Sequence, residues 1–296
     1  MASAVPAVCT LACMATAGLV SLAYGFTEAS THSWTAPLTV TLIGVAVALL
    51  VSFVAWERRT SHPLLPLRVV LDRNRGGSYL AFLLATLGMF AVFLFLTFYM
   101  QNVLGWSPLK SGFAFLPFPL GIITSATIAS KTLPKYGPRP LATLGFSMGA
   151  LGLLWLTQLP PHPAYLTHLV PSMLLISLGM GQVFVPLSST ALLGVPQHDA
   201  GVASALVNTM QQVGGSLGVA FLNTIATTAT LAYADSHGGP SPAAMTHGFT
   251  TAFAYSAAVF ALAAVVVATL IKAKRHDLAP PAPATEHEGR MELAFA

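Results

Sequence analysis

The residues of this sequence that could bind another molecule are mainly amides and hydroxyls, and they recur at helical spacing inside apolar segments. At about 100° per residue, one face of the segment Ala200–Ala232 collects five polar or small residues, with Gln212 beside them. This face consists of Ser204, Asn208, Gln211, Gly215 and Gly218. Side chains of this kind are expected to face a helix bundle or a water-filled cavity and not lipid.

Two other apolar segments carry shorter polar faces at the same spacing. One face holds Gln182, Pro186 and Ser189, and the other holds Phe90, Phe93, Thr97 and Gln101. These faces predict either a central cavity lined by amides, hydroxyls and aromatic rings, or polar contacts that join helices. For the amides both interpretations stay open. Close helix packing is favoured for the glycines Gly214, Gly215 and Gly218.

The patterns that support enzyme chemistry are missing. The sequence has no His/Cys cluster at metal-ligand spacing, no pair of carboxylates inside an apolar segment and no phosphate-binding Gly-Lys-Ser/Thr loop. We therefore expect neither catalysis nor a cofactor or metal. Asp199, which precedes the segment Ala200–Ala232, is interpreted as the N-cap of that helix, with a role in ion coupling as the alternative.

The composition explains why so few polar groups are present. Charged residues make up 7% of the chain and hydrophobic residues 55%, against about 25% charged residues in an ordinary soluble domain. No Asp, Glu, Lys or Arg occurs from Pro140 to His198, from Gly76 to Leu109 or from Ala200 to Ala234. Lipid penalises charge, so these stretches predict helices that lie in a bilayer.

Eight segments reach the roughly 20 residues of helix that a bilayer requires, and they predict an all-α polytopic membrane protein. The expected spans are Val5–Gly25, Pro37–Trp56, Gly76–Val103, Lys110–Ser130, Pro140–Gln158, Tyr165–Leu187, Ala200–Ala232 and Gly248–Ile271.

The basic residues between these spans predict the orientation of the chain. With eight spans, 12 of the 13 lysines and arginines fall on one side together with both termini, and only Lys110 falls on the other. The positive-inside rule makes the basic side cytoplasmic. Because the basic residues separate apolar segments, they are interpreted as topology signals, and no nucleic-acid partner is expected.

These features divide the chain into four parts. Residues 1–57 are expected to form a two-helix transmembrane hairpin, and residues 58–75 a basic cytoplasmic loop. Residues 76–272 are expected to form a six-helix unit, and the Pro- and Glu-containing segment 273–296 a disordered cytoplasmic tail.

Three stretches resemble the fourteen-helix drug:proton antiporters of the major facilitator superfamily. The stretch from Asp199 to Gly218 (DAGVASALVNTMQQVGGSLG) is similar to their penultimate helix, and Tyr99–Gly112 (YMQNVLGWSPLKSG) to a turn between two helices. The stretch from Trp56 through His62-Pro-Leu-Leu-Pro-Leu is similar to the loop after their eighth helix.

The resemblance implies a multidrug efflux protein of the cell membrane, working by alternating access with a proton as counter-ion. The first two spans would match the family's two extra central helices, and the next six its C-terminal six-helix half. This half would supply a mostly apolar cavity wall for small amphipathic organic compounds. The candidate residues of that wall are Phe93, Thr97, Gln101, Gln182, Asn208 and Gln211.

The sequence departs from the family in two respects. The loop from Lys131 to Arg139 resembles a second copy of the family's cytoplasmic loop signature, with Gly137 and Arg139 at its glycine and basic positions, but Pro134 stands where Asp is expected. No counterpart of the N-terminal six helices, which carry the coupling charges, is found. We therefore expect the chain to act with a separate N-terminal half or a second copy, and not alone. The alternative is a membrane scaffold or assembly subunit that transports nothing.

Overall fold

The computed structural model describes residues 4–32, 35–57, 71–160, 164–273 and 277, and every regular element in these residues is a helix. Seven helical segments are long and apolar enough to cross a membrane, judged by length and composition. They are Thr10–Ala29, Pro37–Glu57, Arg73–Val103, Pro108–Tyr136, Tyr165–Ala191, Ala200–Ser236 and Pro242–Leu270.

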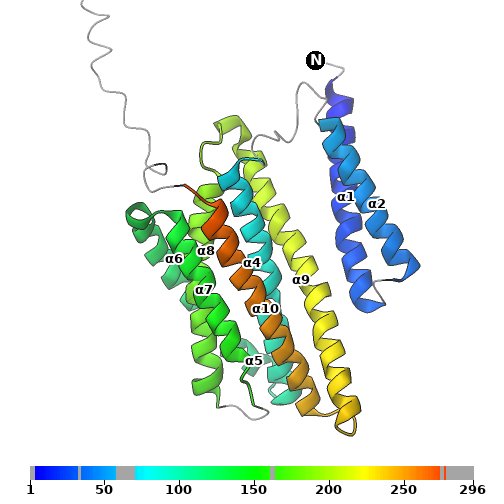
Figure 1. The fold of residues 1–296 in the computed structure, drawn as a ribbon, viewed down its shortest axis with the longest axis vertical. Helices are drawn as coiled ribbons and strands as arrows, with labels where there is room; N and C mark the ends of the chain where they lie inside the picture. Colours follow the sequence, from blue (N-terminus) through cyan, green and yellow to red (C-terminus); the bar gives the residue numbers. More distant parts are fainter. Residues whose placement is uncertain (1–3, 33–34, 58–70, 161–163, 274–276, 278–296) are drawn as a thin grey trace, which may run out of the picture.

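The first two helices, α1 (Ala4–Thr31) and α2 (Pro37–Glu57), pack against each other as an antiparallel pair. In Figure 1 this blue pair stands beside the rest of the bundle, which it meets along α9 (Ala200–Ser236). Contacts between α1 and α9 join the pair to the other helices. The pair therefore covers one side of α9.

The remaining helices form a closely packed bundle. After α4 (Arg73–Phe98) the chain continues as a π-helical turn, η1 (Tyr99–Val103), and then as the short α5 (Pro108–Ala114). The other elements are α6 (Pro117–Tyr136), α7 (Pro138–Leu156), the π-helical η2 (Tyr165–Leu169), α8 (Val170–Ala191), the 3-10 turn η3 (Gln197–Asp199), α9 and α10 (Pro242–Leu270). Helix α8 packs on α6, α7 and α4, while α4 also packs on α9 and α10.

Seven of the eight predicted spans coincide with the seven membrane-length segments, and the fifth does not. The predicted span Pro140–Gln158 corresponds to α7, a helix of 19 residues that is not among the seven. Its first turn contains Pro138, Arg139 and Pro140, which shortens the apolar part of the helix. The count of eight spans therefore stays a prediction.

Local capping explains where several helices begin. The Asp72 carboxylate accepts hydrogen bonds from the backbone N–H of Asn74 (3.1 Å) and Arg75 (3.0 Å), so α4 begins at Arg73 and includes residues predicted to lie in the preceding loop. Ser241 caps α10 in the same way, and this helix begins six residues before the predicted span. The rest of the predicted basic loop, residues 58–70, and residues 278–296 of the predicted tail lie outside the described residues.

The start of α4 is tied to the ends of two other helices. The Asn74 side-chain oxygen accepts hydrogen bonds from the backbone N–H of Lys272 (2.7 Å) and Ala273 (3.0 Å), which follow α10. Arg75 donates to the Leu193 carbonyl (3.2 Å) in the connection between α8 and α9. Figure 1 shows the start of α4, the end of α10 and the turn between α6 and α7 at the same end of the bundle. We call this end the basic end.

Candidate functional site

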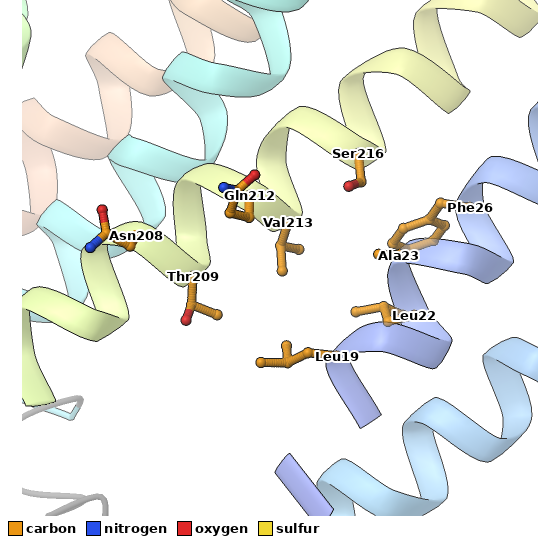
Figure 2. Close-up of a pocket in the computed structure, with 9 residues that line it drawn as sticks. All are labelled: Leu19, Leu22, Ala23, Phe26, Asn208, Thr209, Gln212, Val213 and Ser216. Atoms are coloured by element: carbon orange, nitrogen blue, oxygen red, sulfur yellow. The ribbon is translucent and has the colours of Figure 1, made fainter. Parts of the chain in front are cut away.

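A cavity of about 240 Å³ lies between α1 and α9. Its α9 wall carries most of the polar groups, and its α1 wall is apolar (Figure 2). The lining residues are Leu19, Leu22, Ala23 and Phe26 of α1, and Asn208, Thr209, Gln212, Val213 and Ser216 of α9. The cavity is therefore mostly apolar, and its few polar groups come from α9.

Helical periodicity places the α9 residues on this wall. Thr209, Gln212, Val213 and Ser216 follow the spacing i, i+3, i+4, i+7, which brings them to one face of a helix. Asn208 and Gln212 are four residues apart and both are exposed. Among the residues that the structure describes, neither amide takes part in a hydrogen bond. Both can therefore donate to or accept from a bound molecule.

The cavity contains a predicted candidate, Asn208, but not its predicted neighbour Gln211. Gln211 is half-buried and lies about 60° from Asn208 around the helix, on the side away from Gln212. Gln212, which the sequence placed beside the predicted face, lines the cavity. Gln212, and not the adjacent Gln211, therefore lies at the candidate site.

Three glycines of α9, Gly214, Gly215 and Gly218, face α4 instead of the cavity. A Cβ atom on Gly214 or Gly218 would overlap the backbone carbonyl oxygen of Leu83 or Leu87, and one on Gly215 would lie 2.6 Å from the Phe90 ring. All three glycines are buried. This is the geometry of two helices in close contact, the role favoured for these glycines by the sequence.

Gln182 lies in a different place, at the contact between α8 and α6. Its amide nitrogen donates to both the backbone oxygen and the hydroxyl of Ser125, each at 3.2 Å, and the Ser125 hydroxyl donates to the Leu178 carbonyl. Gln182 is 8% exposed and lines a second hollow between α6 and α7. The sequence left two interpretations open for Gln182, a cavity lining and a polar contact between helices. Its hydrogen bonds to Ser125 form a contact between helices.

The three candidates on α4 and η1 do not reach the α1–α9 cavity. The Phe93 ring packs against Phe115 and Phe118, with ring centroids 5.8 Å and 5.0 Å away. The Thr97 hydroxyl donates to the Phe93 carbonyl of its own helix (2.5 Å), and Gln101 is half-buried within the π-helical turn η1. The six predicted cavity residues therefore occupy separate parts of the bundle.

Three further positions complete the comparison with the sequence. Gly137 has φ +82° between α6 and α7, a conformation that glycine adopts without strain, and Arg139 is exposed in the first turn of α7. Asp199 is 6% exposed and occupies the N-cap position of α9, as predicted, but its side chain makes no capping hydrogen bond to that helix. Within the described part of the chain, no three His, Cys, Asp or Glu side chains could hold a metal ion.

Seven membrane-length apolar helices define a multi-pass helical membrane protein. The chain belongs to the major facilitator superfamily, whose sequence profile matches residues 8–219. Membership of this family indicates a transmembrane transporter, and not an enzyme.

Curated relatives with export and resistance names are similar to most of the chain. The puromycin resistance protein of Streptomyces alboniger is 46% identical over 264 residues, which cover 87% of this chain and 52% of the relative. The cephamycin export protein of Amycolatopsis lactamdurans is 35% identical over 91% of this chain and 54% of the relative. The lincomycin resistance protein of Streptomyces lincolnensis is 32% identical over 69% of this chain and 42% of the relative. The chain thus spans about half the length of these relatives.

Proposed function

We propose that this chain forms the C-terminal part of a multidrug exporter of the fourteen-helix type, located in the cell membrane and working by proton-coupled alternating access. In this proposal α1 and α2 are the two central helices, α4 to α10 supply a six-helix transporter half, and α7 crosses the membrane as the eighth span. The basic end of the bundle, together with both termini, is cytoplasmic.

The observation that carries the proposal is the mostly apolar cavity between α1 and α9, whose few polar groups come from α9. Small organic compounds that are mainly apolar and carry some hydrogen-bonding groups suit an apolar pocket with a few amides and hydroxyls on one side. Its volume of about 240 Å³ lies below the roughly 300–1,000 Å³ of typical drug-sized sites, so it would hold only part of such a compound. The names of the puromycin, cephamycin and lincomycin relatives favour compounds of this kind.

The lining of the cavity suggests that other helices complete the transport path. None of its nine residues carries a carboxylate, lysine, arginine or histidine, so none can exchange a proton near neutral pH. We propose that the coupling group and the opposite wall come from a second six-helix half. That half would belong to the same polypeptide, to a separate chain or to a second copy.

The proposal is tested by replacing Asn208 and Gln212 together with leucine at the native locus. We expect increased cellular accumulation of puromycin and lincomycin with an unchanged amount of membrane-inserted protein, because a site for amphipathic compounds would lose its hydrogen-bonding wall. The matched control is Gln211→Leu, an amide-to-leucine change in the same helix outside the cavity lining. It should leave drug accumulation unchanged.

The same experiment separates a transporter from a scaffold. For a membrane scaffold that transports nothing, drug accumulation would be the same in the parent strain, the double variant and a deletion strain. That result would refute the proposed transport function. A dissipated proton gradient should raise drug accumulation in the parent to the level of the deletion strain; if it does not, export is driven by another ion or energy source.

A further inference from the structure

A second hollow, about 460 Å³ in volume, lies between α6 and α7 with α8 as its floor. It is predominantly apolar, and we call it the α6–α7 groove. Helices α6 and α7 contact each other much less than each contacts α8, which leaves the space between them open. Ile128, Tyr136 and Leu144, which line this groove, are 48%, 67% and 56% exposed. The groove therefore opens onto the outer surface of the helix bundle.

The depth of the groove matches one leaflet of a bilayer. Its lining residues on α6 run from Ser125 to Tyr136, which are eleven positions apart, or about 16 Å at 1.5 Å per residue. Half of a hydrocarbon core is about 15 Å thick. Tyr136 and Pro140 lie beside the turn between α6 and α7, at the basic end, and Ser125 with Gln182 forms the deep end. A lipid acyl chain anchored at the basic end would thus extend along most of the groove.

Basic residues outside the lining lie near the groove, toward the basic end of the bundle. Lys131 and Lys135 on α6 and Arg139 on α7 are all exposed, and Lys135 and Arg139 flank Gly137 at the turn where the groove begins. Neither α6 nor α7 contains an Asp or Glu residue. This charge favours an anionic headgroup over a zwitterionic one, since basic residues near a membrane surface attract anionic lipids.

We propose that the α6–α7 groove binds one anionic phospholipid, with an acyl chain against Ile128 and Leu144 and the headgroup phosphate held by Lys135 and Arg139, with Lys131 beside it. The proposal does not depend on transport, because it concerns the outer surface of the bundle and not the α1–α9 cavity. The bound lipid would fill the space between α6 and α7 where the two helices do not touch.

Native mass spectrometry of the purified full chain tests this site. The protein is incubated in detergent with equal amounts of phosphatidylglycerol and phosphatidylcholine that have identical acyl chains. We expect retention of one phosphatidylglycerol molecule in preference to phosphatidylcholine. Equal retention of the two lipids would overturn the proposal by showing that the headgroup charge has no role. Retention of neither would overturn it as well.

Two pairs of variants locate the bound lipid. Replacing Lys131, Lys135 and Arg139 together with glutamine should weaken phosphatidylglycerol binding at least tenfold, whereas Lys110→Gln in α5, at the other end of the bundle, should not. Ile128→Trp should fill the groove and lower the retention of phosphatidylglycerol. Ile123→Trp makes the same change at an exposed α6 position outside the lining and should leave retention unchanged. Equal effects within either pair would overturn the assignment to this groove.

Discussion

The contact between α4 and α9 predicts that Gly218→Ala destabilises the protein. A Cβ atom on Gly218 would overlap the Leu87 carbonyl oxygen and lie 2.9 Å from the Leu87 Cα atom, whereas carbon atoms in contact prefer about 3.5–4.0 Å. Backbone atoms cannot rotate away as a side chain can, so the two helices would separate by roughly 0.5–1 Å.

The size of the effect follows from two opposing contributions. Forcing an extra methyl group into a packed contact costs about 1–3 kcal/mol, and alanine gains up to about 1 kcal/mol over glycine in helix propensity. We therefore expect a net loss of about 1–2 kcal/mol for Gly218→Ala. Gly215→Ala should cost less, because its new Cβ meets the side chain of Phe90, which is 44% exposed and can move.

Thermal unfolding of the purified variants in one detergent measures this order. The control is Gly201→Ala in the first turn of the same helix, where a Cβ would meet no atom within 4 Å, so its stability should be unchanged or slightly higher. The expected order of midpoints is Gly201→Ala, then Gly215→Ala, then Gly218→Ala. If Gly218→Ala unfolded at the same temperature as Gly201→Ala, the close approach of α4 and α9 would be refuted.

Two further predictions concern single hydrogen-bonding side chains. Asn74→Ala should speed amide exchange at Lys272 and Ala273 about tenfold, because both N–H groups lose their acceptor. Asn74→Asp keeps an acceptor and should retain the protection. Unchanged exchange in the alanine variant would contradict this prediction. Gln182→Leu should lower stability by about 0.5–1.5 kcal/mol, the range for hydrogen bonds between membrane helices. Thermal unfolding measures it, and a variant as stable as the parent would show that the bonds to Ser125 contribute nothing.

The hydrophobic pattern was sufficient to predict the helices and their approximate positions. Seven predicted spans coincide with membrane-length segments because a run of about 20 apolar residues is a property of the local sequence. The predicted spans differ from the observed helices at their ends, because capping residues set where a helix begins. Asp72 and Ser241 extend α4 and α10 beyond the apolar runs, and η1 continues α4 as a π-helical turn, which no hydropathy pattern reveals.

The candidate site was predicted only in part. Periodicity placed Asn208, Gly215 and Gly218 on one face of one helix. The structure directs Gly214 and Gly218 to α4 and places Gln212 at the cavity between α9 and α1, because α9 lies between these two helices. The signal that could have separated them is the i, i+3, i+4, i+7 spacing of Thr209, Gln212, Val213 and Ser216.

By itself, the sequence determined that this protein is helical and embedded in a membrane, because the near absence of charge over long segments is incompatible with a water-exposed surface. Only the tertiary structure decided which polar groups remain available for binding. Gln182 and Asn208 looked equivalent in the sequence, yet Gln182 bonds to Ser125 on another helix, whereas Asn208 faces a cavity. The physical reason is that a side chain's partners come from neighbouring helices, and helix spacing alone does not specify which helices these are.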